Sequence, residues 1–249
     1  MTAKVSILLR GYSYSSPEEG SLGFCGVYLV EAPGPWRLVF DTGHAGRRRA
    51  LLRALAGRGL SPADIDVVVL SHGHWDHVQN VDVFTRSLIY AQQDLDAPEP
   101  GDPVTPSWTP ATLAGLRTRL VRDGDEPASG VTVLALPGHT AGSIGLAVAT
   151  DDGLAVLTGD AVSSAHALRT GRCTVARHDP DAADRSLRRV ADLADVIYPG
   201  HDHPFRVGNG VPGDYLAPVR SIVLRGSDPA RAAVRLPGTS MWRGRTWSR

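Results

Sequence analysis

Short runs of β-branched and other apolar residues, separated by turn-forming residues, recur along the chain and predict many strands. The expected strands lie at residues 3–9, 22–31, 36–40, 66–70, 87–91, 117–121, 131–136, 143–149, 154–158 and 195–198. The run at 66–70 is almost continuously apolar, which is typical of a strand that is buried on both faces. Thr150-Asp151-Asp152-Gly153 is a strong turn signal and predicts that two of the strands form a hairpin.

Two longer segments show helical spacing instead. Within residues 45–56 the leucines at 51, 52 and 55 form one apolar stripe, and Gly57 ends the pattern. Asp179-Pro180 is a helix start signal, and Leu187, Val190 and Leu193 then lie on one side. Strands and helices recur in two similar halves, so the pattern predicts an α/β architecture of sheets covered by helices.

Composition narrows the class of protein. The 249 residues carry 26 basic and 26 acidic side chains, so no overall charge draws the chain to nucleic acid or to a membrane surface. No apolar run reaches the roughly 18 residues of a membrane span, and the first apolar run is too short for a signal peptide. Two cysteines are too few for a disulfide framework. We therefore expect a soluble, cytoplasmic protein with a small-molecule substrate and no membrane partner, its oligomeric state left open.

Four side chains able to bind metal follow the strand at 66–70, in Ser71-His72-Gly73-His74-Trp75-Asp76-His77. His72 and His74, two apart in an extended segment, can face one ion. Asp76 and His77 can turn toward a second ion. The spacing therefore suits two neighbouring metals.

Three further ligand-type residues each follow an apolar strand and a glycine. They are His139, Asp160 and His201. Glycine lets the backbone turn closely around an ion, and the end of a strand holds a ligand on a rigid element. Seven imidazoles and carboxylates at such places are hard to explain as core or surface residues, so we infer a metal site.

In the order Asp41-Thr42-Gly43, His72 to His77, His139, Asp160 and His201, the sequence resembles the metallo-β-lactamase superfamily. The resemblance implies an αββα four-layer sandwich with a dinuclear site at one edge. On the matching positions, His72, His74 and His139 would hold the first metal, and Asp76, His77 and His201 the second. Asp160 would bridge the two metals, and Asp41 would support the histidine loop. True zinc β-lactamases lack the bridging aspartate, so Asp160 disfavours an antibiotic-degrading role.

Two divalent ions about 3.5–4 Å apart can share a hydroxide, lower its pKa toward ~7 and polarise the carbonyl that it attacks. Asp76 and Asp160 are the candidate catalytic residues, since either carboxylate could orient the water or accept its proton. The leading hypothesis is hydrolysis of a small ester, thioester or lactone. Imidazole and carboxylate ligands suit zinc, our first choice, as well as iron or manganese.

Two other activities stay open. The segments Leu9-Arg10-Gly11-Tyr12 and His201 to Val207 are similar to those of animal single-domain members linked to histone pre-mRNA cleavage, which favours a phosphodiesterase or ribonuclease. A mononuclear iron enzyme resembling the persulfide dioxygenases would use largely the same ligand positions. Substrate choice is expected to lie in the loops at 11–21, 97–110 and 161–178.

We expect the catalytic domain at residues 1–215 and a basic extension at 216–249, partly ordered at best. From residue 220 onward the extension has seven arginines against one acid, Asp228, with Trp242 and Trp247 among them. Arginines interleaved with tryptophans could bind single-stranded nucleic acid, but we favour a loosely docked tail. Within the histidine loop, Trp75 could line the pocket or pack beneath the loop, whereas His44 and His203 are expected to be surface residues.

Overall fold

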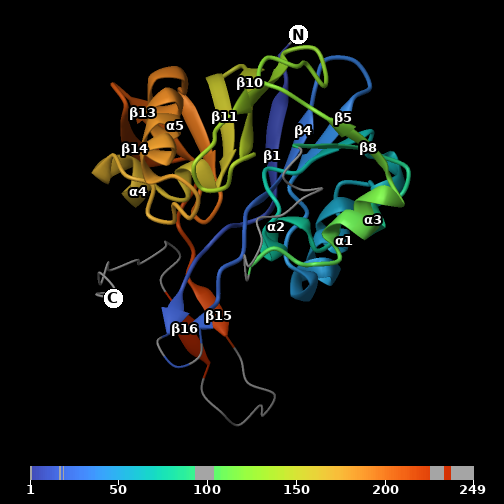
Figure 1. Cartoon of the computed structure of the whole chain (residues 1–249), viewed down its shortest axis with the longest axis horizontal. Helices are drawn as coiled ribbons and strands as arrows, with labels where there is room; N and C mark the ends of the chain where they lie inside the picture. Colours follow the sequence, from blue (N-terminus) through green and yellow to red (C-terminus); the bar gives the residue numbers. More distant parts are fainter. Residues whose placement is uncertain (1, 17, 19, 93–103, 225–232, 237–249) are drawn as a thin grey trace.

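The structure is a computed structural model that describes residues 2–16, 18, 20–92, 104–224 and 233–236 (Figure 1). Two six-stranded sheets pack face to face, and helices cover the outer face of each one. This arrangement is the predicted αββα sandwich.

The first sheet has the strand order β1-β4-β5-β6-β7-β8. Its strands are β1 (Lys4–Leu9), β4 (Val27–Glu31), β5 (Arg37–Phe40), β6 (Val67–Val69), β7 (Leu88–Ala91) and β8 (Arg117–Leu120). From β5 to β8 the strands are parallel, so their carboxyl ends share one edge of the sheet. Along β6, Val67 and Val69 face the second sheet while Val68 faces the helices, which confirms that this strand is buried on both faces.

The second sheet has the order β14-β13-β12-β11-β10-β9. Its strands are β9 (Val131–Ala135), β10 (Ile144–Thr150), β11 (Gly153–Gly159), β12 (Val196–Pro199), β13 (Phe205–Gly208) and β14 (Val211–Tyr215). The predicted hairpin is confirmed, because Thr150 pairs with Gly153 across the turn between β10 and β11. Only β11 and β12 are parallel neighbours in this sheet, and the segment that connects them contains helices α4 and α5.

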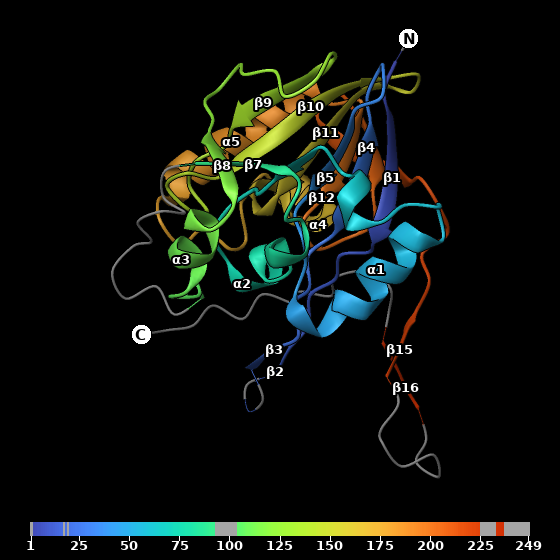
Figure 2. The same cartoon turned by 90° about the vertical axis from the view of Figure 1, so that its right-hand side faces the viewer.

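Five α-helices lie in the described part of the chain: α1 (Arg48–Ala56), α2 (Trp75–Val78), α3 (Thr109–Ala114), α4 (Ala165–Thr170) and α5 (Pro180–Leu193). Apolar residues of the first three pack on the first sheet, and those of the last two pack on the second (Figure 2). The predicted start of α5 is confirmed, since the Asp179 side chain accepts a hydrogen bond from the Ala182 backbone N–H. None of the described helices is long and apolar enough to cross a bilayer.

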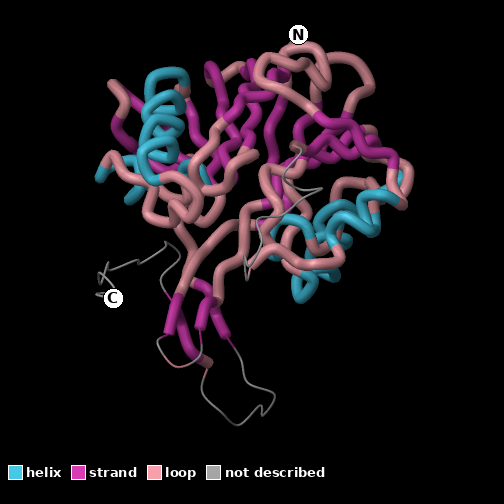
Figure 3. The backbone as a smooth tube through the Cα atoms, viewed as in Figure 1, coloured by secondary structure: helices cyan, strands magenta, loops and turns pink. Residues whose placement is uncertain are grey.

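Short helical turns occur at η1 (Ala45–Arg47), η2 (Pro62–Asp64), η3 (Val81–Val83) and η5 (Asp160–Val162). Two small strand pairs extend beyond the sandwich, β2 (Ser15–Ser16) with β3 (Gly20–Ser21), and β15 (Ile222–Leu224) with β16 (Val234–Leu236) (Figure 3). The second pair falls within the expected basic extension, whereas residues 237–249, with both tryptophans, lie outside the described residues.

Two expectations about local structure need correction, and several elements were not predicted. The strand expected at 22–31 begins only at Val27, because the preceding segment leaves the sheet and Gly26 N–H donates to Gly200 O across 2.6 Å. The expected loop at 97–110 ends in helix α3, which begins at Thr109, while residues 97–103 lie outside the described residues. Helices α2 and α4 and strands β13 and β14 were not predicted, since they are short and lack a clear apolar period.

Candidate metal centre

The seven predicted ligands come from loops at the ends of four strands and meet at one edge of the sandwich. His72 and His74 follow β6, and the single turn of α2 then carries Asp76 and His77. The other three come from the second sheet: His139 follows β9, Asp160 follows β11 and His201 follows β12. All seven are buried, with at most 8% of their surface exposed.

Three imidazoles converge in the first set of ligand atoms. The Nδ1 atom of His74 lies 2.9 Å from the Nε2 atoms of both His72 and His139, and those two Nε2 atoms are 3.2 Å apart. Asp160 Oδ2 lies 3.4 Å from His139 Nε2. Ligand atoms that each lie about 2.0–2.1 Å from one zinc ion would have distances of this size between them.

The second set contains two imidazoles and two carboxylates. Asp160 Oδ1 lies 3.1 Å from His201 Nε2 and 3.5 Å from His77 Nε2. Asp76 Oδ2 lies 3.5 Å from His201 Nε2 and 3.8 Å from His77 Nε2. Asp160 thus offers one carboxylate oxygen to each set.

Polar atoms left without a hydrogen bond show that cations fit these positions. Asp76 Oδ2, His77 Nε2 and Asp160 Oδ1 are fully buried and have no hydrogen-bond partner. Leaving such atoms unpaired costs about 1–3 kcal/mol each, more when the group is charged. They all belong to the second set, and a divalent cation would satisfy them together.

The outward ring nitrogens of the histidines are held by polar groups of the protein. His77 Nδ1 lies 2.8 Å from Asp41 Oδ2, and Asp41 also accepts hydrogen bonds from the backbone and hydroxyl of Ser71. His139 Nδ1 lies 2.5 Å from Val175 O, and His201 Nδ1 lies 3.3 Å from Tyr12 O. Such contacts fix which nitrogen of each ring faces the centre.

Glycine before a ligand is required by close packing at two positions. A Cβ atom on Gly200 would lie 2.3 Å from Asp160 Oδ1, and one on Gly138 would lie 2.0 Å from Ala183 N. Gly138 also has a positive φ of 128°. Larger residues would therefore displace the loops that carry His139 and His201.

The histidines of the metal-free centre fall into two groups, one with a lowered pKa and one with a raised pKa. Burial lowers the pKa of His72 and His139. Burial also disfavours the charged form of His201, but the adjacent Asp160 carboxylate outweighs it and raises the pKa of His201 to about 9. The pKa of His77 is likewise raised well above 6.5, against its burial, by the surrounding carboxylates of Asp41, Asp76 and Asp160. In turn, the neighbouring histidines lower the pKa of the buried Asp160.

Sequence reasoning missed Cys25, Ser71 and the carbonyl of Tyr12. The Cys25 thiol is fully buried and donates to Asp76 O across 2.9 Å. Burial raises the pKa of this thiol to about 12, so in the metal-free protein it is a neutral packing group. Ser71 could have been noticed because it precedes the histidine loop, but Cys25 and Tyr12 give no local signal.

The expectation for one other side chain was wrong, and one of the two alternatives for Trp75 is excluded. His203 is not a surface residue, since it is 4% exposed and its ring packs 6.0 Å from that of Tyr215. Trp75 does not pack beneath the histidine loop, because 43% of its surface is exposed. His44 is half-buried, with its ring between those of Phe24 and Trp75.

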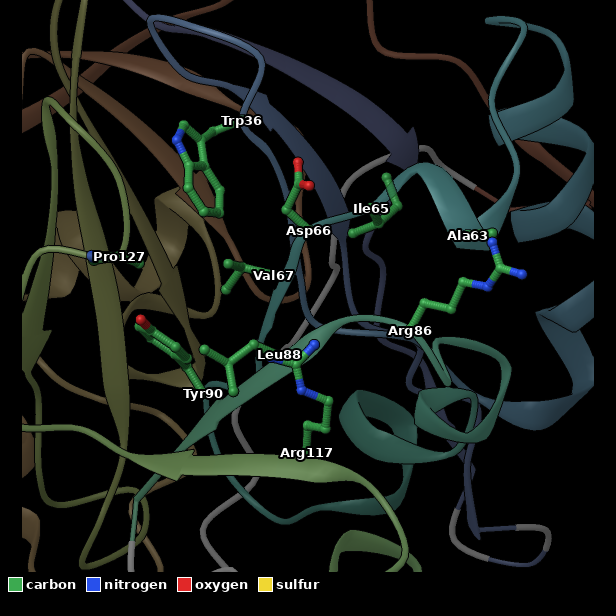
Figure 4. A pocket seen from close by; sticks show the side chains of 10 residues that line it. All are labelled: Trp36, Ala63, Ile65, Asp66, Val67, Arg86, Leu88, Tyr90, Arg117 and Pro127. Carbon is green, nitrogen blue, oxygen red and sulfur yellow. The ribbon is translucent and has the colours of Figure 1, made fainter.

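A separate groove of about 310 Å³ lies at the other end of the parallel strands, away from the seven ligands (Figure 4). Trp36, Asp66 and Tyr90 contribute to its walls, together with Arg86 and Arg117. Trp36 and Asp66 immediately precede β5 and β6, whereas the ligand loop follows the carboxyl end of β6. The groove is therefore not part of the candidate metal centre.

Comparison with known proteins identifies the class. Residues 20–201 match the profile of the metallo-beta-lactamase superfamily. The chain is 32% identical over 211 residues to metallo-beta-lactamase domain-containing protein 1 of Xenopus laevis, covering 82% of this chain and 81% of that protein. The chain therefore belongs to the metallo-β-lactamase superfamily and is a metal-dependent hydrolase.

Two further proteins extend the comparison. An N-acyl homoserine lactonase of Agrobacterium fabrum is 31% identical over 163 residues, which cover 58% of this chain and 59% of the lactonase. The crystal structure of a probable metal-dependent hydrolase from Staphylococcus aureus superposes with a TM-score of 0.71 at 15% identity, covering 89% of this chain and 99% of that one. At this sequence identity, the structural similarity supports only the assignment of the fold.

Proposed function

We propose that the protein is a dinuclear metal-dependent hydrolase that cleaves a small carboxylic ester, thioester or lactone. One observation carries the proposal. Asp160 presents Oδ2 to the three-histidine set and Oδ1 to the set that contains His77 and His201. A carboxylate shared in this way suits two neighbouring cations rather than one.

In this proposal His72, His74 and His139 hold the first ion, Asp76, His77 and His201 hold the second, and Asp160 bridges them. When bound there, divalent ions supply Lewis acidity, which lowers the pKa of water toward ~7 and polarises a substrate carbonyl. Zinc is our first choice among the ions, and iron or manganese would suit the same ligands.

Two carboxylates of the protein can accept the proton of the attacking water. Asp76 and Asp160 both lie beside the second set, so either carboxylate can accept a hydrogen bond from the attacking water and take its proton. The water oxygen bonds to the carbonyl carbon, the bond to the ester oxygen or thioester sulfur breaks, and the leaving group gains a proton. The products are a carboxylic acid and an alcohol or thiol, and no side chain acts as nucleophile.

Carbonyl substrates are favoured by the similarity to the Agrobacterium lactonase. Asp160 disfavours β-lactams as substrates, because true zinc β-lactamases lack the bridging aspartate. Two free cysteines support a cytoplasmic location. We further propose that residues 1–215 are the catalytic domain, since all seven ligands lie within them, and that 216–249 form a basic extension.

A substrate panel tests the proposal. The zinc-loaded protein is assayed with a lactone, a thioester and a phosphodiester, beside a variant in which His74→Ala removes one ligand. Turnover of the lactone or thioester that His74→Ala abolishes would support the proposal. Turnover of the phosphodiester alone would favour the phosphodiesterase alternative, and a single iron per chain with no hydrolysis would favour the iron oxygenase.

A further inference from the structure

The groove at the opposite end of the parallel strands from the metal centre has the size and lining of a binding site (Figure 4). Its volume of about 310 Å³ lies in the range that small organic ligands occupy in proteins. Val67 and Leu88, which pair between the neighbouring strands β6 and β7, contribute apolar surface to it. The ligand loop begins after the other end of β6, so a molecule in this groove would not contact the metal centre.

Aromatic side chains form one side of the groove. Trp36 and Tyr90 lie there with Pro127 between them (Figure 4). The Trp36 side chain is 47% exposed, while its backbone is held in the turn between β4 and β5, because Trp36 O accepts a hydrogen bond from Ala32 N–H. A flat ring placed against this side would cover the exposed indole and make favourable ring contacts.

The hydroxyl of Tyr90 lacks the partner that a buried tyrosine usually has. Only 6% of Tyr90 is exposed, and its side chain lines the groove. Its hydroxyl forms no hydrogen bond with any residue that the structure describes. By contrast, the hydroxyl of the buried Tyr28 donates to Pro199 O across 2.6 Å, and that of Tyr215 donates to Asp202 across 3.1 Å. The Tyr90 hydroxyl is therefore available to a ligand in the groove.

Positive charge is concentrated beside Tyr90. Arg117 and Arg119 lie two apart on the edge strand β8, where they pair in register with Leu88 and Tyr90 of β7. Paired residues point to the same face of a sheet, so both arginines lie on the groove side. The Arg119 guanidinium is 5.7 Å from the centroid of the Tyr90 ring. Arg117 lines the groove and forms no ion pair or hydrogen bond within the described part of the chain.

The other charged groups of the groove already have partners. Asp66 Oδ2 accepts a hydrogen bond from Arg37 N–H across 2.8 Å, and Asp66 and Arg117 lie apart across the groove (Figure 4). Arg86 extends away from the aromatic side, and its charge favours the ionised form of Asp64. Arg117 is therefore the cation that an anionic ligand would meet.

We propose that this groove binds a small aromatic anion. The ring of the ligand would lie against Trp36 and Pro127, and its anionic group would pair with Arg117 and accept a hydrogen bond from Tyr90. A guanidinium binds carboxylate and phosphate alike through two parallel N–H···O bonds, so either group could supply the charge. Binding here requires neither a metal ion nor hydrolysis and is independent of the proposed function.

Calorimetric titration with three probes tests the class of ligand. The probes are 2-naphthoate, 2-naphthylphosphonate, which has no ester bond to hydrolyse, and the neutral 2-naphthamide. We expect at least one of the two anions to bind at least about tenfold more tightly than the amide. The tighter anion shows whether the site prefers a carboxylate or a phosphate. Equal affinities for all three probes, or no binding at millimolar concentration, would overturn the proposal.

Substitutions in the groove test the location of the bound anion. Trp36→Ala and Arg117→Gln should each weaken binding of the preferred anion at least about tenfold. Tyr90→Phe, which keeps the ring and removes the hydroxyl, should weaken it several-fold. Unchanged binding in Trp36→Ala and Arg117→Gln would overturn the proposal.

Matched variants elsewhere serve as controls. Trp108→Ala and Arg53→Gln alter exposed side chains that do not line the groove, so both should bind the anion as the wild type does. His74→Ala, which removes a candidate metal ligand, should also leave this binding unchanged. Binding that is lost in His74→Ala but kept in the groove variants would place the anion at the metal centre and reject the groove.

Discussion

The imidazole of His77 donates its Nδ1 proton to Asp41, with 2.8 Å between Nδ1 and Asp41 Oδ2, and both side chains are buried. The contact leaves His77 Nε2 facing the second set of ligand atoms. Asp41 also accepts two hydrogen bonds from Ser71, so one carboxylate anchors both ends of the histidine loop.

Replacing Asp41 tests this support. Asp41→Asn is expected to weaken metal binding at the second set by about 10–100-fold, because the neutral amide holds the imidazole less well. Competition with a metal chelator measures the affinity. Asp66→Asn is a suitable control, since Asp66 also accepts a backbone hydrogen bond, from Arg37, but lies at the opposite end of the strands. Equal affinities in both variants would contradict the role of Asp41.

Replacing Asp160 tests the shared carboxylate. Asp160→Ala is expected to lower the content of both ions and to reduce kcat/KM by at least about a hundredfold, since both sets lose a ligand. Elemental mass spectrometry of the purified variant gives the metal content. Asp152→Asn, at an exposed carboxylate, should bind as much metal as the wild type. Loss of only one ion from Asp160→Ala would argue against a bridging role.

Replacing Gly200 tests the close packing of two ligand loops. In Gly200→Ala the new methyl group would lie 2.3 Å from Asp160 Oδ1, so the carboxylate or the loop must move. We expect less bound metal and a free energy of unfolding that is lower by roughly 1–3 kcal/mol, measured by urea denaturation. Gly208→Ala serves as the control, since its methyl group would meet no atom within 4 Å. Wild-type metal content in Gly200→Ala would refute the packing argument.

Metal binding should release protons. In the metal-free protein the pKa of His201 is raised to about 9 and that of His77 is raised well above 6.5, so both rings are protonated at neutral pH. Zinc binds only the neutral ring, hence each histidine must lose a proton. Calorimetry in buffers of different ionisation enthalpy should show this release at neutral pH and a smaller release above about pH 9. His201→Gln should release about one proton fewer, and a release independent of pH would contradict the prediction.

Much of the fold and the positions of the candidate ligands could be predicted from the sequence. Strands such as β6 are marked by continuous apolar residues, and the candidate ligands follow such strands directly, so local pattern places both. The carboxyl ends of parallel strands share an edge of the sheet, which explains why Ser71 and Asp41 come together.

Contacts between segments distant in the sequence could not be predicted in the same way. The carbonyl of Tyr12 reaches His201 only because the chain leaves the first sheet after Leu9, and no periodicity of the sequence predicts that path. The ring contacts of His44 with Phe24 and Trp75 have the same origin, since the three residues belong to separate segments of the chain. Strands β13 and β14 alternate poorly and contain exposed residues, so they have no clear sequence signal.

A titration of hydrolysis against added zinc tests the dinuclear hydrolase most directly. Metal-free protein receives increasing zinc, and the rate of lactone hydrolysis is measured at each step. The shared Asp160 predicts a rate that rises to a plateau at about two equivalents of zinc per chain. A plateau at one equivalent would contradict the two-ion centre, and no hydrolysis at any zinc concentration would contradict the lactonase activity itself.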